Sequence, residues 1–102
     1  MAADYTVRVV TFREGEWYVA QCLEWDLATQ ARSPETLLDE VRRLLTAHVV
    51  AAHETGREPF ANLPAAPLRF HRMWEVARET RDLPLPLPGR EASPHVLLRS
   101  AA

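Results

Sequence analysis

Three side chains that could do chemistry stand close together in this sequence. Cys22, Glu24 and Asp26 provide one thiol and two carboxyl groups. Metal-dependent hydrolysis of nucleic acids needs several carboxylates that converge on two metal ions. Glu24 and Asp26 share one expected loop, and the first expected strand has no carboxylate in its middle, with Asp4 only at its start. We therefore expect no catalytic residue, no metal site and no enzymatic activity.

The thiol and the histidines indicate no cofactor either. Cys22 is the only cysteine, so neither an intramolecular disulfide nor a Cys-rich metal site can form. A single cysteine in an apolar stretch is typically a small buried hydrophobe, and no histidine lies near it in sequence to act as a base. His48 and His53 are separated by five positions, which on a helix does not give the i, i+4 pair of a metal site.

Composition limits the function classes. A chain of 102 residues with 47% apolar residues predicts one globular domain. The formal net charge is −2, although all twelve basic residues are arginine, and this balance argues against nonspecific binding to nucleic acid. No apolar run resembles a signal peptide or a membrane span, so we expect a cytoplasmic protein with no membrane partner.

Three stretches predict strands. Residues 5–13 are rich in Val, Thr and aromatic side chains, residues 17–23 continue that pattern, and residues 27–31 form a shorter stretch. Glu14-Gly15 between the first two predicts a two-residue hairpin turn, because glycine accepts the positive φ that such a turn demands. Residues 24–26 then form the loop before the third strand.

The hairpin that this turn defines has two different faces. The expected register sets Arg13 opposite Glu16 and Phe12 opposite Trp17. One face then carries Val7, Val9, Ala20 and Cys22, and the other carries Val10, Phe12, Trp17, Val19 and Leu23 with Arg8 and Gln21. We assign the long helix to the first face, because its side chains are small. A second element or a partner is expected to cover part of the second, aromatic face.

A long helix is predicted from Pro34 to about Glu54. Ser33 is a suitable N-cap, and proline is favoured at the first helical position. Apolar residues recur at helical spacing, namely Leu37/Leu38, Val41, Leu44/Leu45, Val49 and Ala52. Asp39 and Arg43 are spaced for an i, i+4 ion pair, and Gly56 ends the helix.

The remaining residues divide into a connector and a tail. Prolines at positions 59, 64 and 67 mark a connector after the core of residues 4–56. A second, shorter helix follows within residues 57–82 and carries one apolar stripe, namely Ala66, Phe70, Met73, Trp74 and Ala77. Alternating prolines predict an extended segment over residues 83–88. A terminal strand is expected at residues 95–99, within the last part of the single domain, residues 83–102.

Several short motifs occur in the order found in one known family. They are Trp17-Tyr18-Val19-Ala20, Cys22-Leu23-Glu24, Ala28-Thr29-Gln30, Thr36-Leu37-Leu38-Asp39-Glu40, Gly56-Arg57-Glu58-Pro59 and Leu63-Pro64. In this order and spacing, which covers about residues 5–60, the chain resembles the HicB family of antitoxins. The resemblance implies an α+β fold with a small antiparallel sheet in the order βββαβ, a partial RNase H-like fold without catalytic activity. One long helix packs on this sheet, and the second, short helix is an addition to the family pattern.

The resemblance also implies a function. HicB proteins bind and mask a small RNA-cleaving toxin of HicA type, and the residues we expect to bind a partner are Phe12, Trp17, Glu24, Trp25 and Asp26. The chain departs from the family where Trp25-Asp26 replaces Pro-Gly and Ala31 replaces Gly. The residues after the terminal strand are too few for the usual C-terminal DNA-binding module, so direct DNA binding is not expected.

An alternative function remains open from the sequence. In this alternative the chain has the same fold and acts as a homo-oligomeric regulatory or structural domain without a toxin partner. In either case we expect a homodimer, because the aromatic sheet face and the terminal strand offer surface for association.

Overall fold

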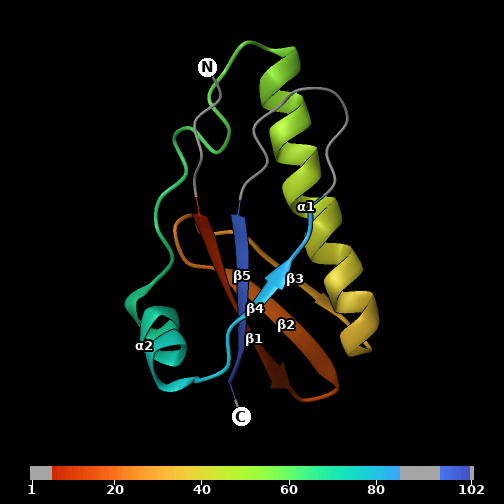
Figure 1. Ribbon diagram of the computed structural model, residues 1–102, viewed down its shortest axis with the longest axis vertical. Helices are drawn as coiled ribbons and strands as arrows, with labels where there is room; N and C mark the ends of the chain where they lie inside the picture. The colour runs from red at the N-terminus through yellow and green to blue at the C-terminus, as the bar shows by residue number, and fades with distance from the viewer. Residues whose placement is uncertain (1–5, 86–94, 102) are drawn as a thin grey trace.

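The computed structural model describes residues 6–85 and 95–101 (Figure 1). The start of the first expected strand, at residue 5, and residues 86–88 of the expected extended segment lie outside this range. The elements are β1 (Thr6–Glu14), β2 (Trp17–Cys22), β3 (Ala28–Ala31), α1 (Pro34–Glu54), α2 (Leu68–Val76), β4 (Arg81–Leu83) and β5 (His95–Ser100). Among these residues, no helix combines the length and apolar character needed to cross a membrane.

The five strands form one mixed sheet in the order β3-β2-β1-β5-β4. β1 pairs antiparallel with β2, but β5 lies parallel to β1 on its other side. The expectation of an antiparallel sheet is therefore wrong, because β5 is parallel to β1. The order βββαβ is not confirmed, because α2 and β4 stand between α1 and β5. The pattern of a strand does not encode the direction of its partner, and a parallel pair needs a long crossover. The expected α+β class and the two helices are confirmed.

The β1–β2 hairpin turns one residue later than expected. Its turn residues are Gly15 and Glu16, with φ of 62° at Gly15, and Phe12 lies opposite Val19 rather than Trp17. Arg13 accordingly lies opposite Tyr18, not Glu16. The pairing is shifted by two positions, an even number, so every side chain stays on the face that the sequence predicted.

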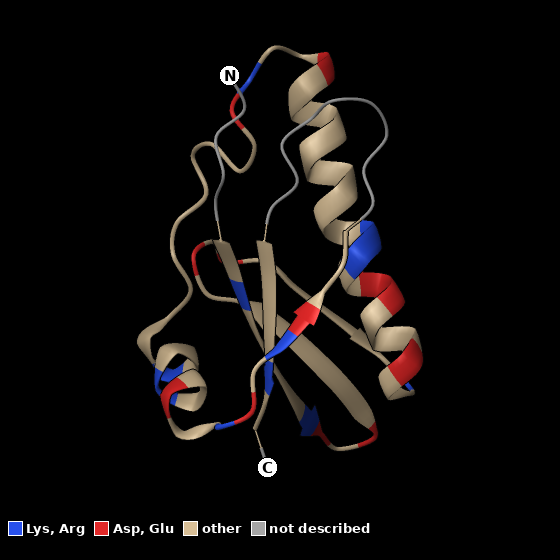
Figure 2. Cartoon of the chain, in the orientation of Figure 1, with Lys and Arg blue, Asp and Glu red and all other residues tan. Residues whose placement is uncertain are grey.

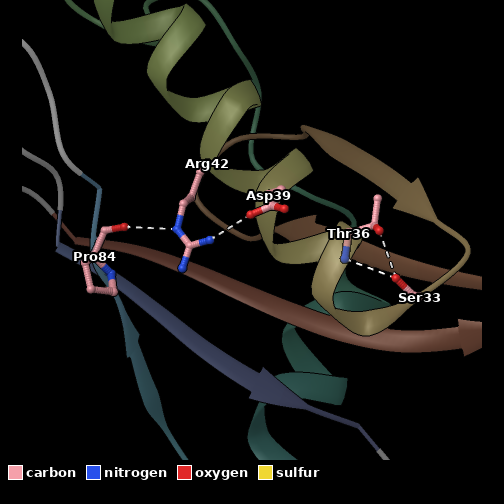
Figure 3. A network of polar contacts seen from close by, with 5 residues as sticks. All are labelled: Ser33, Thr36, Asp39, Arg42 and Pro84. Carbon is pink, nitrogen blue, oxygen red and sulfur yellow. Dashed lines mark hydrogen bonds and ion pairs between the residues drawn. The ribbon is translucent and has the colours of Figure 1, made fainter.

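α1 covers the face with small side chains, as expected. Its buried residues are Leu37, Val41, Leu45, Val49 and Ala52. Four of them, all except Ala52, share one core cluster with Val7, Val9, Ala20 and Cys22 of the sheet. Ser33 caps the helix, since its hydroxyl accepts a hydrogen bond from the Thr36 N–H at 3.2 Å (Figure 3). The long helix and its assignment to this face are confirmed.

The exposed side of α1 is tied to the segment that follows β4. Arg42 donates to the Pro84 carbonyl at 3.4 Å and to Asp39 at 3.1 Å (Figure 3). The expected Asp39–Arg43 pair is wrong, because Arg43 contacts Glu40 instead, at 3.6 Å. Leu83 and Leu85 on either side of Pro84 are buried in the α1 core cluster. The chain after β4 therefore packs beside α1.

α2 covers part of the opposite, aromatic face. Phe70 and Trp74 form a second core cluster with Val10 and Leu23, and the Phe12 ring stacks on Phe70 at 5.9 Å between centroids. The prediction that a second element covers part of this face is confirmed. α1 and α2 thus lie on opposite faces of one sheet, an arrangement visible in Figure 1.

Leu45→Ala should lower the free energy of unfolding by about 2–5 kcal/mol, because the side chain is fully buried between α1 and the sheet. Urea unfolding followed by circular dichroism measures the change. The matched control is Leu68→Ala, since Leu68 is 63% exposed on α2 and its truncation should cost less than about 0.5 kcal/mol. Equal effects of the two variants would contradict the assignment of the α1 core.

Candidate functional site

The five residues expected to bind a partner do not form one site. Phe12 and Trp17 lie beside the hairpin turn, where β1 ends and β2 begins. Residues 24–26 follow the far end of β2 and form the loop before β3. The two groups therefore lie at opposite ends of β2 and have different contacts.

At the hairpin end, Trp17 differs from Phe12 in what covers it. Phe12 packs against the α2 cluster, whereas half-buried Trp17 belongs to neither core cluster. The Arg32 guanidinium lies over the Trp17 ring, 4.3 Å from its centroid, and contacts Glu16 at 3.2 Å. Such contacts at an exposed site contribute about 0.5–1 kcal/mol. Trp17 is thus held by side chains that a partner can displace at little cost.

Glu24 fastens the loop before β3 to the central strand. Its two carboxylate oxygens accept hydrogen bonds from the Arg8 backbone N–H at 2.7 Å and from Arg8 Nε at 2.6 Å. The Leu23 N–H donates to the Arg8 carbonyl at 2.9 Å in the same place. Glu24 therefore has a structural role in joining this loop to β1.

Asp26 satisfies a buried amide. Its side chain accepts a hydrogen bond from Gln21 Nε2 at 2.9 Å, and Gln21 is 4% exposed. Its backbone N–H donates to the Pro64 carbonyl at 2.7 Å. Gln21 Nε2 also donates to the Cys22 carbonyl at 3.0 Å, so Asp26 satisfies the second of its two N–H groups. Because a buried donor without an acceptor costs about 1–3 kcal/mol, Asp26 stabilises both the loop and the connector.

Trp25 anchors the connector through a stack of three rings. Its indole lies 4.2 Å from the Phe60 ring, and His48 of α1 stacks on Phe60 at 5.5 Å. Phe60 has a φ of 62°, an unusual conformation for a residue with a side chain, which the buried stack stabilises. Phe60 was not predicted to contribute to the core, although one aromatic residue among prolines is a signal that the connector packs on the core.

A second contact that the sequence did not predict involves Arg99. Its guanidinium donates to Thr80 Oγ1 at 2.8 Å and to the carbonyls of Trp74 and Ala77 at 3.0 and 3.2 Å. Ala77 is the residue at which α2 ends. Arg99 thereby satisfies helix-end carbonyls that no backbone donor reaches from within the helix.

Cys22 is a core residue. It is 2% exposed, and burial, with a smaller contribution from the charge of Glu24, raises the pKa of the thiol from 9.0 to about 12. The thiolate is the reactive form of cysteine, so this thiol is inert near neutral pH. Within residues 6–85 and 95–101, no group of three or more His, Cys, Asp and Glu side chains could hold a metal ion.

The part of the aromatic face that α2 leaves uncovered is the candidate interaction surface. We call it the hairpin surface and define it as Trp17, Val19, Gln30 and Arg32. Gln30 is opposite Val19 in the β2–β3 pairing, and Val19 is half-buried and belongs to neither core cluster. β3 lies at the edge of the sheet that the described strands form, so the hairpin surface adjoins an edge that no described strand covers.

Comparison of the chain with protein-family models, with curated proteins and with solved structures finds no match.

Cys22 should react with a thiol reagent at about pH 8 much more slowly in the folded protein than in concentrated urea, because the folded thiol keeps its proton. The measurement is the rate of disulfide exchange with a chromogenic aromatic disulfide. Equal rates in the folded and unfolded states would show that Cys22 is accessible and ionised, contrary to its position in the core.

Proposed function

We propose that this chain is a HicB-like module that binds and masks a small RNA-cleaving toxin of HicA type, without catalytic activity of its own. The observation that carries the proposal is the combination of the family-like motifs with the sheet order β3-β2-β1-β5 under α1. If α2 and β4 are taken as an insertion, the remaining elements follow the order βββαβ. The proposed function places the protein in the cytoplasm. Direct DNA binding is not part of the proposal.

The carboxylates of the expected site are already engaged within the chain. Glu24 is engaged by Arg8, and Asp26 is engaged by Gln21, so both carboxylates already have structural partners. Of the three aromatic residues among the five, only Trp17 lies outside both the ring stacks and the core clusters, and it is half-buried. Tryptophan is enriched among residues that dominate binding energy. We therefore place the partner contact on the hairpin surface.

Trp17→Glu should weaken capture of the toxin at least about tenfold, because it replaces a central aromatic contact by a charge. The test is co-purification of the tagged chain from its native host, followed by assay of each captured small basic protein for RNA cleavage with and without added chain. Val76→Glu is the matched control, since Val76 is 77% exposed on α2, away from the hairpin surface.

Support requires a captured protein whose RNA cleavage the wild-type chain and the Val76→Glu variant both inhibit. Trp17→Glu should inhibit at least about tenfold less well, the loss expected for a dominant contact. Failure to capture any RNA-cleaving protein would contradict the toxin-masking function. Full inhibition by the Trp17→Glu variant would instead contradict the choice of surface.

A second candidate function is a homodimeric regulatory or structural domain without a toxin. It is favoured by the open edge of β3 beside the uncovered Trp17 and Val19. Two copies related by a twofold axis can pair such edges and bury both aromatic surfaces at once. α2 already covers Phe12 and Val10, so the interface would be smaller than the whole aromatic face.

Light scattering at micromolar concentration should give twice the chain mass of 11.6 kDa if the hairpin surface joins two copies. Trp17→Glu should give a folded monomer, because the interface loses the aromatic contact and burying the new carboxylate there costs its hydration. Val76→Glu should remain dimeric. A mass of one chain at every concentration tested would eliminate the dimer.

A further inference from the structure

We propose that the cavity between the start of α1 and the connection from α2 to β4 binds a small organic anion that carries an apolar group. This inference is independent of the toxin and of the hairpin surface. The cavity has a volume of about 450 Å³, within the range of roughly 300–1,000 Å³ that is usual for small-molecule sites. Its walls come from four regions of the chain: the end of β1 with the start of β2, the start of α1, residues 78–81, and the end of β5.

One wall of the cavity is apolar. Leu37 and Leu38 line it from the first turns of α1, and Leu98 lines it from β5. Tyr18 of β2 adds an aromatic ring, and both Leu38 and Tyr18 are only partly buried. An apolar group of a ligand can pack on these side chains, whose surface is already partly removed from water.

Three arginines line the same cavity. Arg13, Arg78 and Arg81 come from separate places in the chain, and all three are exposed. Arg13 contacts the Gly15 carbonyl at 3.4 Å and lies over the Tyr18 ring at 5.0 Å. Within the described parts of the chain, none of the three has a carboxylate partner.

What distinguishes these arginines is that they line one cavity, since Arg57, Arg69 and Arg72 elsewhere on the described chain also lack a carboxylate partner. Four arginines are each paired with a carboxylate of the described chain, namely Arg8, Arg32, Arg42 and Arg43. Arg99 is fully engaged with the end of α2. Guanidinium groups bind carboxylate or phosphate oxygens through paired, charge-assisted hydrogen bonds. Three of them around one cavity therefore favour an anionic ligand.

Glu79 reduces the positive charge that the arginines place around the cavity. It also lines the cavity, so the arginines leave an excess of positive charge rather than a purely basic wall. Figure 2 shows acidic and basic segments together on the β1–β2 hairpin and on the connection from α2 to β4, the two parts that meet here. Two hydroxyl groups, of Thr11 and Ser100, line the cavity as well and bond to each other at 2.9 Å. The arrangement fits a ligand with its charge among the arginines and its apolar part against α1.

The test is a titration of the ¹⁵N-labelled protein, followed by NMR, with four probes: phenyl phosphate, benzoate, inorganic phosphate and benzyl alcohol. We expect saturable binding of at least one aromatic anion, with shift changes concentrated at the residues lining the cavity. Inorganic phosphate and benzyl alcohol should bind at least about tenfold more weakly, because each lacks one half of the recognised chemistry. Comparison of phenyl phosphate with benzoate shows which anionic group the site prefers. Added salt should weaken binding.

Variants then assign the contacts. Arg78→Ala and Arg81→Ala should each weaken binding of the preferred aromatic anion about three- to tenfold, as loss of a charge-assisted hydrogen bond implies. Glu79→Gln should tighten it by a few fold, since it removes a repelling charge. Arg72→Ala is the matched control, because Arg72 is exposed on α2 and does not line the cavity. Thermal unfolding confirms that each variant is folded.

Three results would overturn the proposal. The first is binding that does not saturate, or shift changes spread over arginines throughout the surface. The second is an Arg72→Ala variant that weakens binding as much as Arg78→Ala and Arg81→Ala do. The third is a Glu79→Gln variant that binds no more tightly than the wild type, which would show that the cavity charge does not act on the ligand.

Discussion

The whole structure depends on a central strand that must bury both of its faces. β1 lies between β2 and β5, and Val7, Val9 and Val10 along it are completely buried. Val7 and Val9 contact the core beneath α1, whereas Val10 contacts the core beneath α2. A chain of this length can shield both faces only if helices cover the two sides. The connector and α2 are therefore required parts of the fold and not appendages to a hairpin and one helix.

The connector reaches the second face because its backbone is bonded at two points to the segment between β2 and β3. The Pro64 carbonyl accepts from Asp26, and the Ala66 N–H donates to the Leu23 carbonyl at 3.0 Å. The Trp25–Phe60 stack adds an apolar anchor. Residues 24–26, which were predicted from the sequence to bind a partner, thus also determine where α2 lies. A partner that moved this loop would disturb the packing of α2 over β1.

Features set by neighbouring residues could be predicted from the sequence, and features set by distant pairing could not. The bounds and cap of α1 follow from Ser33, Pro34 and the apolar spacing, and the faces of the hairpin follow from alternation. The hairpin register was missed because Gly15 permits turns that start at either of two positions. The parallel place of β5 and the existence of β4 depend on contacts remote in sequence. The candidate site was predicted least well, since the internal partners of Glu24, Trp25 and Asp26 lie in other elements.

The position of β5 has a consequence for folding. Thr11 and Ser100, which bond across β1 and β5, are 89 positions apart in the sequence. On a ribosome, the hairpin and α1 emerge long before residues 95–100 can pair, so the β5 side of β1 stays open for most of synthesis. Contacts of such long range slow folding, and an open strand edge invites pairing with other chains. The nascent protein is therefore most vulnerable to misassembly at β1, although β1 is paired on both sides once the protein is folded.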